Sequence, residues 1–209
     1  MTGYAPEFVD MGKTPRLFRD IIITEKIDGT NAGIHVSPDG QVAAQSRNRI
    51  ITPDSDNYGF ARWVADNADE LAHILGPGLH FGEWWGQGIQ RRYGLTERPV
   101  GDESHVVDRR FSLFNVDRWH KAGPDGESMH SRAEQSSLCG VVDVVPVLYR
   151  GTFREEMIVF VMAELRRAGS FAVPGFMNPE GICVYHSQSR TVYKVTLDNH
   201  DRGKWEAAA

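Results

Sequence analysis

The sequence contains few cysteines and no pattern that would join them. Its 209 residues include only Cys139 and Cys183, which form neither a CxxC pair nor a disulfide-rich pattern. We therefore expect both to be packing residues in a reducing setting. The N-terminus lacks the cationic start and apolar core of a signal peptide, and no apolar run is long enough to span a bilayer. The sequence thus favours a cytoplasmic protein that does not contact membranes.

An excess of positive charge is also missing. The chain has 23 Lys and Arg against 28 Asp and Glu, which gives a net charge of −5. This balance argues against a strongly basic protein that coats nucleic acid without specificity, although it does not exclude a local basic groove. A hydrophobic fraction of 41% is typical of globular chains. We expect one compact domain, or two very small ones, with a core that needs no disulfide or structural metal.

Several familiar motifs are incomplete. The run Gly12-Lys13-Thr14 resembles the end of a phosphate-binding P-loop, but Glu7 stands where that motif begins with glycine. The run Gly86-Gln87-Gly88 lacks the third glycine and the following helix of a dinucleotide-binding turn. The eight histidines show no spacing typical of a metal site. None of these signatures therefore supports a function.

The hydrophobic patterns predict more strands than helices. Alternating or β-branched runs predict strands over 21–27, 31–37, 41–47, 79–86, 109–119, 181–187 and 191–197, with a further apolar stretch over 141–151. Apolar residues at helical spacing predict helices over 60–75 and 153–169. The glycine-bearing segments 86–104 and 121–128 are expected to be loops. This mixed order favours an α+β fold with mixed or antiparallel sheets and flanking helices.

The segment EKIDGTN, residues 25–31, carries the strongest chemical signal. Lys26 ends an apolar strand, and Asp28 lies two residues later and so on the same face. Gly29 permits a sharp turn or a close approach of the backbone. A lysine in this position can act as an amine nucleophile. The alternative is a surface lysine paired with an acid beside a turn, and this segment alone does not decide between them.

Five further segments complete a pattern. They are SRNR (46–49), FGEWWG (81–86), RFSLFNVD (110–117), EGICVY (180–185) and VYKVT (192–196). With EKIDGTN they resemble, in the same order, six motifs of the covalent nucleotidyltransferases, the superfamily of polynucleotide ligases and mRNA capping enzymes. The resemblance runs from Lys26 to Lys194. It implies the ATP-grasp-like nucleotidyltransferase domain of the ligase and capping enzyme type.

Asn31 separates the subgroups of this superfamily. DNA ligases and capping enzymes usually carry arginine at this position, whereas KxDGxN resembles the RNA ligase 2 type. The stretch GEWWGQGIQRRYG also resembles bacterial and phage members of that group. The resemblance therefore implies an ATP-dependent RNA ligase of RNA repair or processing. The alternatives are a minimal ATP-dependent DNA ligase, a capping-type guanylyltransferase, and a nucleotide- or RNA-end-binding module that self-adenylylates without efficient sealing.

The resemblance also implies a reaction in three steps. The lysine amine attacks the α-phosphorus of ATP and forms lysyl-AMP, the AMP passes to an RNA 5′-phosphate, and a 3′-hydroxyl then attacks and releases AMP. Such chemistry depends on positioning and charge neutralisation, to which Mg²⁺ or Mn²⁺ contributes. The implied partners are RNA with 5′-phosphate and 3′-hydroxyl ends and, where the substrate is a nick, a DNA strand. We expect a monomer.

Matching the motifs gives an expected role to each site residue. Lys26, Asp28 and Lys194 are expected to be catalytic. Phe114 is expected to stack on adenine, whereas Phe111 packs in the core. The residues expected to bind the nucleotide are Glu25, Ile27, Asn31, Arg47, Glu83, Phe114, Glu180 and Lys194, with Glu180 also holding the metal. The loop between Gly86 and Gly94, with Arg91 and Arg92, would face RNA or pyrophosphate, or else solvent.

Two positions depart from the family pattern. Thr196 stands where the last motif usually has a second lysine, so Arg190, Arg202 or Lys204 would have to supply that charge, or one step is weakened. Asn115 replaces the usual aspartate after the aromatic residue that stacks on the base, which puts any charge-dependent role of that position in doubt.

The length of the chain bears on its domain organisation. The sequence ends 15 residues after Lys194. Ligases of this superfamily normally place a second domain after the last motif. We therefore expect residues 1–209 to form a single nucleotidyltransferase (adenylyltransferase) domain, with no room for a C-terminal accessory domain.

Overall fold

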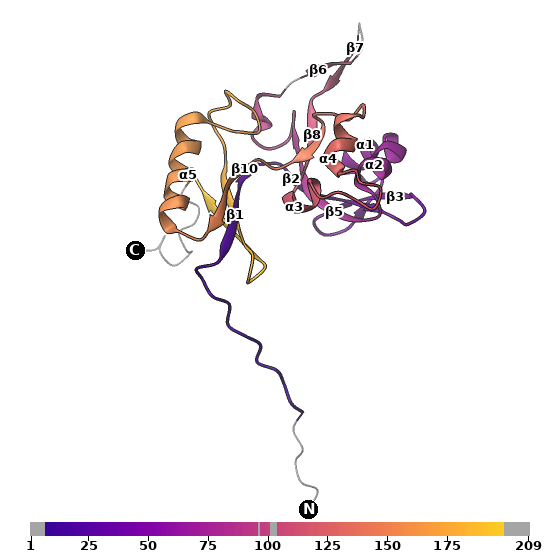
Figure 1. The fold of residues 1–209 in the computed structure, drawn as a ribbon. Helices are drawn as coiled ribbons and strands as arrows, with labels where there is room; N and C mark the ends of the chain where they lie inside the picture. Colours follow the sequence, from indigo (N-terminus) through magenta and orange to yellow (C-terminus); the bar gives the residue numbers. More distant parts are fainter. Residues whose placement is uncertain (1–6, 96, 101–103, 199–209) are drawn as a thin grey trace, which may run out of the picture.

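The computed structural model describes residues 7–95, 97–100 and 104–198, which form two main β-sheets with helices on their outer faces (Figure 1). The first sheet has four antiparallel strands in the order β10-β1-β11-β12. Their bounds are β1 Asp20–Lys26, β10 Val147–Thr152, β11 Gly181–His186 and β12 Thr191–Thr196. Helix α5 (Glu155–Ala168) packs on one face of this sheet.

The second sheet has six strands in the order β4-β3-β2-β5-β8-β9. Its neighbours are antiparallel except for β8 and β9, which are parallel. The strands are β2 Thr30–Val36, β3 Val42–Ser46, β4 Ile50–Ile51, β5 Gly78–Gly86, β8 Arg109–Leu113 and β9 Val142–Val144. The helical segments on this side are α1 Phe60–Asp66, α2 Ala68–Leu75, η1 Arg92–Gly94, α3 Val116–Trp119 and α4 Met129–Glu134. A separate hairpin joins β6 (Glu97–Val100) to β7 (Ser104–Val107).

Three apolar clusters hold these layers together. One lies between the six-stranded sheet and α1, α2 and α4 and contains Phe60, Trp84 and Phe111. A second joins β1 and β11 to α5 through Ile23 and Leu165. The third contains Ile22, Ile27, Trp85, Tyr93, Leu95, Val116 and Val145, so it joins the two sheets. Each fully buried aliphatic or aromatic side chain stabilises the fold by about 1.5–3 kcal/mol relative to exposure.

Strand alternation determines which side chains lie between the sheets. On β1, Ile23 faces α5, so Ile22 and Lys26 face the other sheet. On β5, Trp84 faces the helices, so Glu83 and Trp85 face the first sheet. Lys26 and Glu83 therefore belong to the two faces that meet at the third cluster.

The predicted α+β class, with mixed and antiparallel sheets and flanking helices, is confirmed. The hairpin between 31–37 and 41–47 also forms, with a turn closed by a hydrogen bond from the Gly40 amide to the Ser37 carbonyl (3.0 Å). Within the described part of the chain, no helix is long and apolar enough to cross a membrane.

Several predicted elements differ in detail. The helix over 60–75 is broken at Asn67 into α1 and α2. The segment 141–151 divides at Pro146 into β9 and β10, which enter different sheets. The loop over 86–104 contains η1 and β6, and α4 was not predicted. The predicted strand over 109–119 ends at Leu113 because the Asn115 side chain accepts a hydrogen bond from the Arg118 amide (3.0 Å) and starts α3.

The prediction that both cysteines pack in the core is wrong for Cys139. This residue is exposed, because it lies in the turn between α4 and β9, where Leu138 and Val141 occupy the buried positions. Cys183 is partly buried on β11, and burial raises the pKa of its thiol.

Candidate active site

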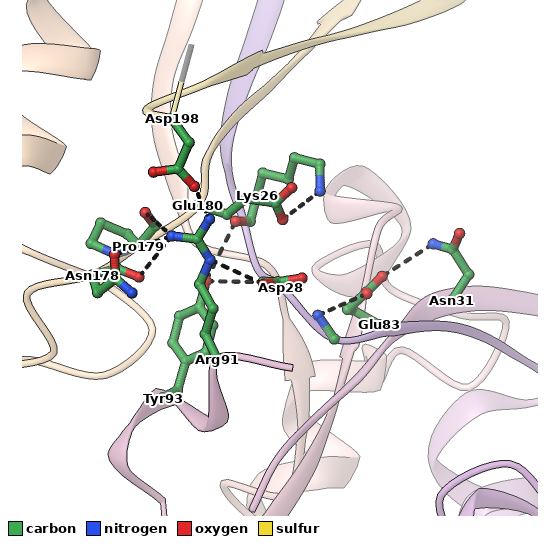
Figure 2. Close-up of polar contacts among 11 residues, drawn as sticks. Lys26, Asp28, Asn31, Glu83, Arg91, Tyr93, Asn178, Pro179, Glu180 and Asp198 are labelled. Carbon is green, nitrogen blue, oxygen red and sulfur yellow. Dashed lines mark hydrogen bonds and ion pairs between the residues drawn. The ribbon is translucent and has the colours of Figure 1, made fainter. Parts of the chain in front are cut away.

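Lys26 and Glu180 form a partly buried ion pair where β1 meets β11 (Figure 2). Lys26 is the last residue of β1 and pairs in register with Gly181, so Glu180 lies beside it. The Lys26 Nζ lies 2.5 Å from the Glu180 Oε2. The two side chains are 25% and 17% exposed. The amine is therefore held in place while it stays accessible to a substrate.

Glu83 projects from the facing sheet and is bound by two donors (Figure 2). Its Oε1 accepts a hydrogen bond from the Gly29 amide, and its Oε2 accepts one from the Asn31 side chain, both at 3.1 Å. Burial raises the pKa of Glu83 to about 7, while the nearby charge of Lys26 opposes that rise. Glu83 and Lys26 thus interact electrostatically across the space between the sheets.

Gly29 allows the chain that leaves β1 to run close beside β5. A Cβ at this position would lie 2.5 Å from the Trp84 carbonyl oxygen and 2.7 Å from the Trp85 Cβ, closer than real Cβ atoms come. Glycine is therefore needed for the backbone after Lys26 to pass close to β5 and donate to Glu83.

Glu25 and Ile27 flank Lys26 but have other partners. The Glu25 side chain is 1% exposed, and its Oε2 accepts hydrogen bonds from the amides of Phe171 (2.8 Å) and Ala172 (2.9 Å). Burial raises the pKa of this carboxyl. Ile27 is buried in the cluster between the sheets. Both side chains therefore help to hold the end of β1 in place. Their contacts with a nucleotide stay predictions.

Asp28 pairs with Arg91. The Arg91 Nε donates to the Asp28 Oδ2 at 3.0 Å, and the Arg91 side chain is only 17% exposed. The solvent-exposed alternative is wrong for Arg91, because intramolecular acceptors occupy its guanidinium, whereas Arg92 is exposed. Contact of either arginine with RNA or pyrophosphate stays a prediction. The sequence reasoning also missed Tyr93, whose hydroxyl accepts from the Asp28 amide (3.1 Å) and donates to the Lys26 carbonyl (3.5 Å).

Strand register places Lys194 on the same side of its sheet as Lys26. Cys183 pairs with both Thr24 and Lys194, and residues directly opposite one another in neighbouring strands share a face. Lys194 is exposed there. Cys183 also lies on this face, and the charges of Lys26 and Lys194 oppose the rise that burial causes in the pKa of its thiol. Sequence reasoning did not identify Cys183 as a neighbour of the site.

Thr196 occupies the position level with Lys26. Gly181 pairs with Lys26 on one side and with Thr196 on the other, so these positions form one row across three strands. Arg190 cannot replace the missing lysine, because it lies in the turn at the opposite end of the β11–β12 hairpin, about 15 Å or more along the strands. Arg202 and Lys204 lie outside the described residues.

The aromatic predictions concern the end of β8. Phe111 is fully buried in the core, as predicted. Phe114 is 44% exposed and lies one residue beyond β8, where its amide donates to the Phe81 carbonyl (3.0 Å). Phe81 is 51% exposed. Arg47 is exposed directly after β3. Stacking of Phe114 on a base and nucleotide binding by Arg47 stay predictions.

The carboxylates of the site can bind a divalent cation such as Mg²⁺ only if a substrate supplies further ligands. Among the described residues, no three His, Cys, Asp or Glu side chains converge as a ready-made metal site. Glu180 nevertheless offers a carboxylate, the ligand type that Mg²⁺ and Mn²⁺ prefer together with phosphate oxygens and water. Residues of this kind suit a metal that arrives with a nucleotide.

Comparisons with known proteins give a family match and structural matches. A family model described as RNA ligase matches residues 19–204. The structure is similar to that of the Naegleria gruberi RNA ligase with PPi, with a TM-score of 0.52, 20% identity, and coverage of 97% of this chain and 61% of that ligase. A mutant of the same ligase with AMP and Mn gives a TM-score of 0.51 and 17% identity, with coverage of 94% and 58%.

These structural matches show the fold, and this chain spans about 60% of the length of the Naegleria gruberi chains. A search of the curated proteins finds no match.

Proposed function

Since this chain belongs to the RNA ligase family, we propose that it joins an RNA 5′-phosphate to a 3′-hydroxyl in an ATP-dependent reaction. The covalent intermediate is lysyl-AMP on Lys26. The observation that carries the proposal is the position of the Lys26 amine, which is held 2.5 Å from the Glu180 Oε2, partly exposed, and within electrostatic range of Glu83. A nucleotide bound between the two sheets can therefore contact the amine from one sheet and the Glu83 carboxyl from the other.

In the first step the Lys26 Nζ attacks the α-phosphorus of ATP. The N–P bond forms, the bond to the pyrophosphate oxygen breaks, and pyrophosphate leaves with that electron pair. The Lys26 ammonium gives one proton to the Glu180 carboxylate 2.5 Å away, so that the neutral amine attacks, and the second proton of the nitrogen leaves with pyrophosphate or to solvent. Mg²⁺ or Mn²⁺, bound through Glu180 and phosphate oxygens, would neutralise charge on the phosphates.

The surrounding residues bind the nucleotide. Glu83 accepts a hydrogen bond from a ribose hydroxyl, a common use of a carboxylate in nucleotide sites, and Asn31 keeps it oriented. Phe114 stacks on adenine, and Arg47 contacts the ribose or phosphates. Lys194 stabilises charge on the α-phosphate from the same face of the sheet as Lys26. Asp28 contributes through its ion pair with Arg91.

The later steps use the same groups. The 5′-phosphate of an RNA strand attacks lysyl-AMP and releases the Lys26 amine, and a 3′-hydroxyl then attacks the activated phosphate and releases AMP. The proposed partners are RNA ends, and a DNA strand can be the other strand of a nick. The protein is proposed to act in the cytoplasm as a monomer, through one adenylyltransferase domain. Thr196 motivates the other candidate, a module that self-adenylylates but seals poorly.

The first experiment asks whether the protein labels itself. The protein is incubated with Mg²⁺ and α-labelled ATP or GTP and then denatured. We expect a label from ATP that survives alkali and is released as AMP in acid. Lys26→Ala and Lys26→Arg should take no label. Lys26→Arg is the matched control, because it keeps a positive charge opposite Glu180 without a nucleophilic amine. Equal labelling of these variants would contradict the assignment of the nucleophile.

The second experiment identifies the acceptor. The isolated labelled protein receives 5′-phosphorylated RNA or DNA strands of the same sequence. The proposal expects AMP to move to RNA ends and joined RNA to follow. A preference for DNA ends would support a minimal DNA ligase. Labelling of the protein by GTP would support a capping-type enzyme, and a label that never leaves the protein would support an end-binding module.

A further inference from the structure

Arg91 lies at the point where the active-site segments come together (Figure 2). It follows β5 of the six-stranded sheet, yet its acceptors belong to segments at the ends of strands of the other sheet. The Nε donates to the Asp28 Oδ2 (3.0 Å), and the Nη1 donates to the Asn178 Oδ1 (3.1 Å) and the Pro179 carbonyl (3.2 Å). The Nη2 pairs with the Asp198 carboxylate. One side chain thus binds three separate segments.

Each of these segments carries a residue of the proposed chemistry. Asp28 comes two residues after Lys26, and Pro179 immediately precedes Glu180. Asp198 follows β12, the strand of Lys194. The position of Arg91 therefore affects the positions of three groups: Lys26, its partner Glu180, and the strand that carries Lys194.

The guanidinium is well suited to this position. Its planar fork presents separate N–H groups in fixed directions, whereas the ammonium of a lysine is a single point charge. Burial acts to lower the pKa of Arg91, but hydrogen bonds to Asp198 and Asp28 raise it above its ordinary value. Arginine stays charged in proteins, and the hydrogen bonds of Arg91 to carboxylates belong to the stronger, charge-assisted class.

We propose that Arg91 is a positioning residue, which rests on the proposed function: it holds the segments of Lys26, Glu180 and Lys194 in register with Glu83 on the facing sheet. Arg91 contacts no substrate. It acts through Asp28 and the backbone before Glu180, and so sets where the Lys26 amine stands relative to the nucleotide bound by the other sheet.

The fold around Arg91 has its own anchors, so variants at this position should still fold. Ile89 and Tyr93 are fully buried on either side of it, and Leu95 is 9% exposed. Tyr93 stacks on Phe176 with ring centroids 4.5 Å apart. Loss of the Arg91 side chain therefore removes a set of polar contacts and leaves the apolar attachment of this segment in place.

The test compares Arg91→Ala and Arg91→Lys with Arg167→Lys. Arg167 also pairs with a carboxylate, that of Glu164, but on the outer surface of α5 with 70% of its side chain exposed. The measurements are the single-turnover rate of self-adenylylation at saturating ATP, the ATP concentration at half saturation, and the melting temperature.

Both Arg91 variants should lose about tenfold or more in the single-turnover rate, with a smaller change in the half-saturating ATP concentration. Arg91→Lys should resemble Arg91→Ala, because positive charge alone cannot bind three segments. Arg167→Lys should behave like the wild type. A wild-type rate in Arg91→Lys would overturn the proposal. So would an unchanged rate together with a higher half-saturating ATP concentration, because that result indicates direct contact of Arg91 with ATP.

A readout independent of activity separates this inference from the proposed function. The ¹H–¹⁵N NMR signals of Gly29 and Gly181 report the backbone next to Lys26 and Glu180. They should shift in both Arg91 variants and not in Arg167→Lys. Unchanged signals would refute the positioning role even if the wild type labels itself. A wild type that takes no label would refute the proposed function and leave the NMR result to decide the role of Arg91.

Discussion

At the scale of single residues, the buried environment of Glu83 changes the pKa of its carboxyl. The residue is 8% exposed, and burial raises the pKa of its carboxyl to about 7 even though Lys26 opposes the rise. A ribose hydroxyl can be held by either form of such a group, since the carboxylate accepts and the carboxylic acid can also donate. The motif predicted the side chain, but the raised pKa depends on neighbours from other segments.

Replacing Lys26 by methionine should raise the pKa of Glu83 further. The ammonium favours the ionised carboxylate, and methionine keeps an unbranched side chain without the charge. A ¹³C NMR titration of the Glu83 carboxyl should give a midpoint near 7 in the wild type and a higher midpoint in Lys26→Met. Glu83→Gln identifies the signal by its loss. Equal midpoints in both proteins would show that Lys26 and Glu83 do not interact as described.

The same shift predicts a dependence of stability on pH. Between the ordinary value of 4.5 and about 7, folded Glu83 keeps a proton that the unfolded chain has lost. The free energy of unfolding therefore falls as pH rises through this window, by up to about 3 kcal/mol. Glu83→Gln removes this contribution, and Asn31 can rotate its amide to accept from the new group.

Urea unfolding at several pH values measures the effect. As pH rises from about 5 to about 8, the wild type should lose free energy of unfolding relative to Glu83→Gln. A constant difference over this range would contradict the raised pKa.

At the scale of elements, the turn between β1 and β2 connects the two sheets and carries most of the first motif. The sequence indicated both strands and the need for glycine after Asp28, because local patterns determine these features. It could not indicate that Gly29 passes against β5, since that contact joins residues more than fifty positions apart. The partners of Arg91 and the role of Tyr93 were missed for the same reason, since the segments that they contact are distant in sequence.

Gly29→Ala should disturb the site more than the fold. Its Cβ would meet the Trp84 carbonyl oxygen at 2.5 Å, so the turn must shift and the hydrogen bond from the Gly29 amide to Glu83 must lengthen. We expect a loss of about 1–3 kcal/mol in stability and a loss of about tenfold or more in self-adenylylation.

Gly40→Ala is the matched control for this substitution. Gly40 has a φ of +85° in the turn between β2 and β3, and an added methyl group there would meet no neighbouring atom within 4 Å. It should lose stability of about 1 kcal/mol while the labelling rate is unchanged. Equal labelling by Gly29→Ala and the wild type would contradict the role assigned to the turn.

At the scale of the whole molecule, two sheets carry complementary halves of the proposed site. The first sheet supplies Lys26, Glu180 and Lys194, and the second supplies Glu83 and Asn31. The order of the motifs indicated the family and the fold class because it records a whole architecture. The division of α1 and α2 at Asn67 and the separation of β9 from β10 were beyond the sequence patterns, since packing on different layers decides them.

Net charge predicts how salt affects the two halves of the reaction. At −5 the chain has little general affinity for polynucleotides, so the RNA binding that we propose would depend on a few Lys and Arg contacts with phosphates. Raising salt from about 50 mM to about 200 mM should lower AMP transfer to RNA by about tenfold or more, while self-adenylylation changes by about twofold or less. Sealing that persists well above physiological salt would contradict this expectation.

Peptide mapping of the self-labelled protein tests the central claim most directly. The protein is incubated with ATP and Mg²⁺, quenched in alkali and digested, and the peptide that carries AMP is sequenced by mass spectrometry. We predict that AMP is attached to the side chain of Lys26, and that Lys26→Arg yields no modified peptide. AMP on Lys194 or on any other residue, or no modified peptide from the wild type, would contradict the account.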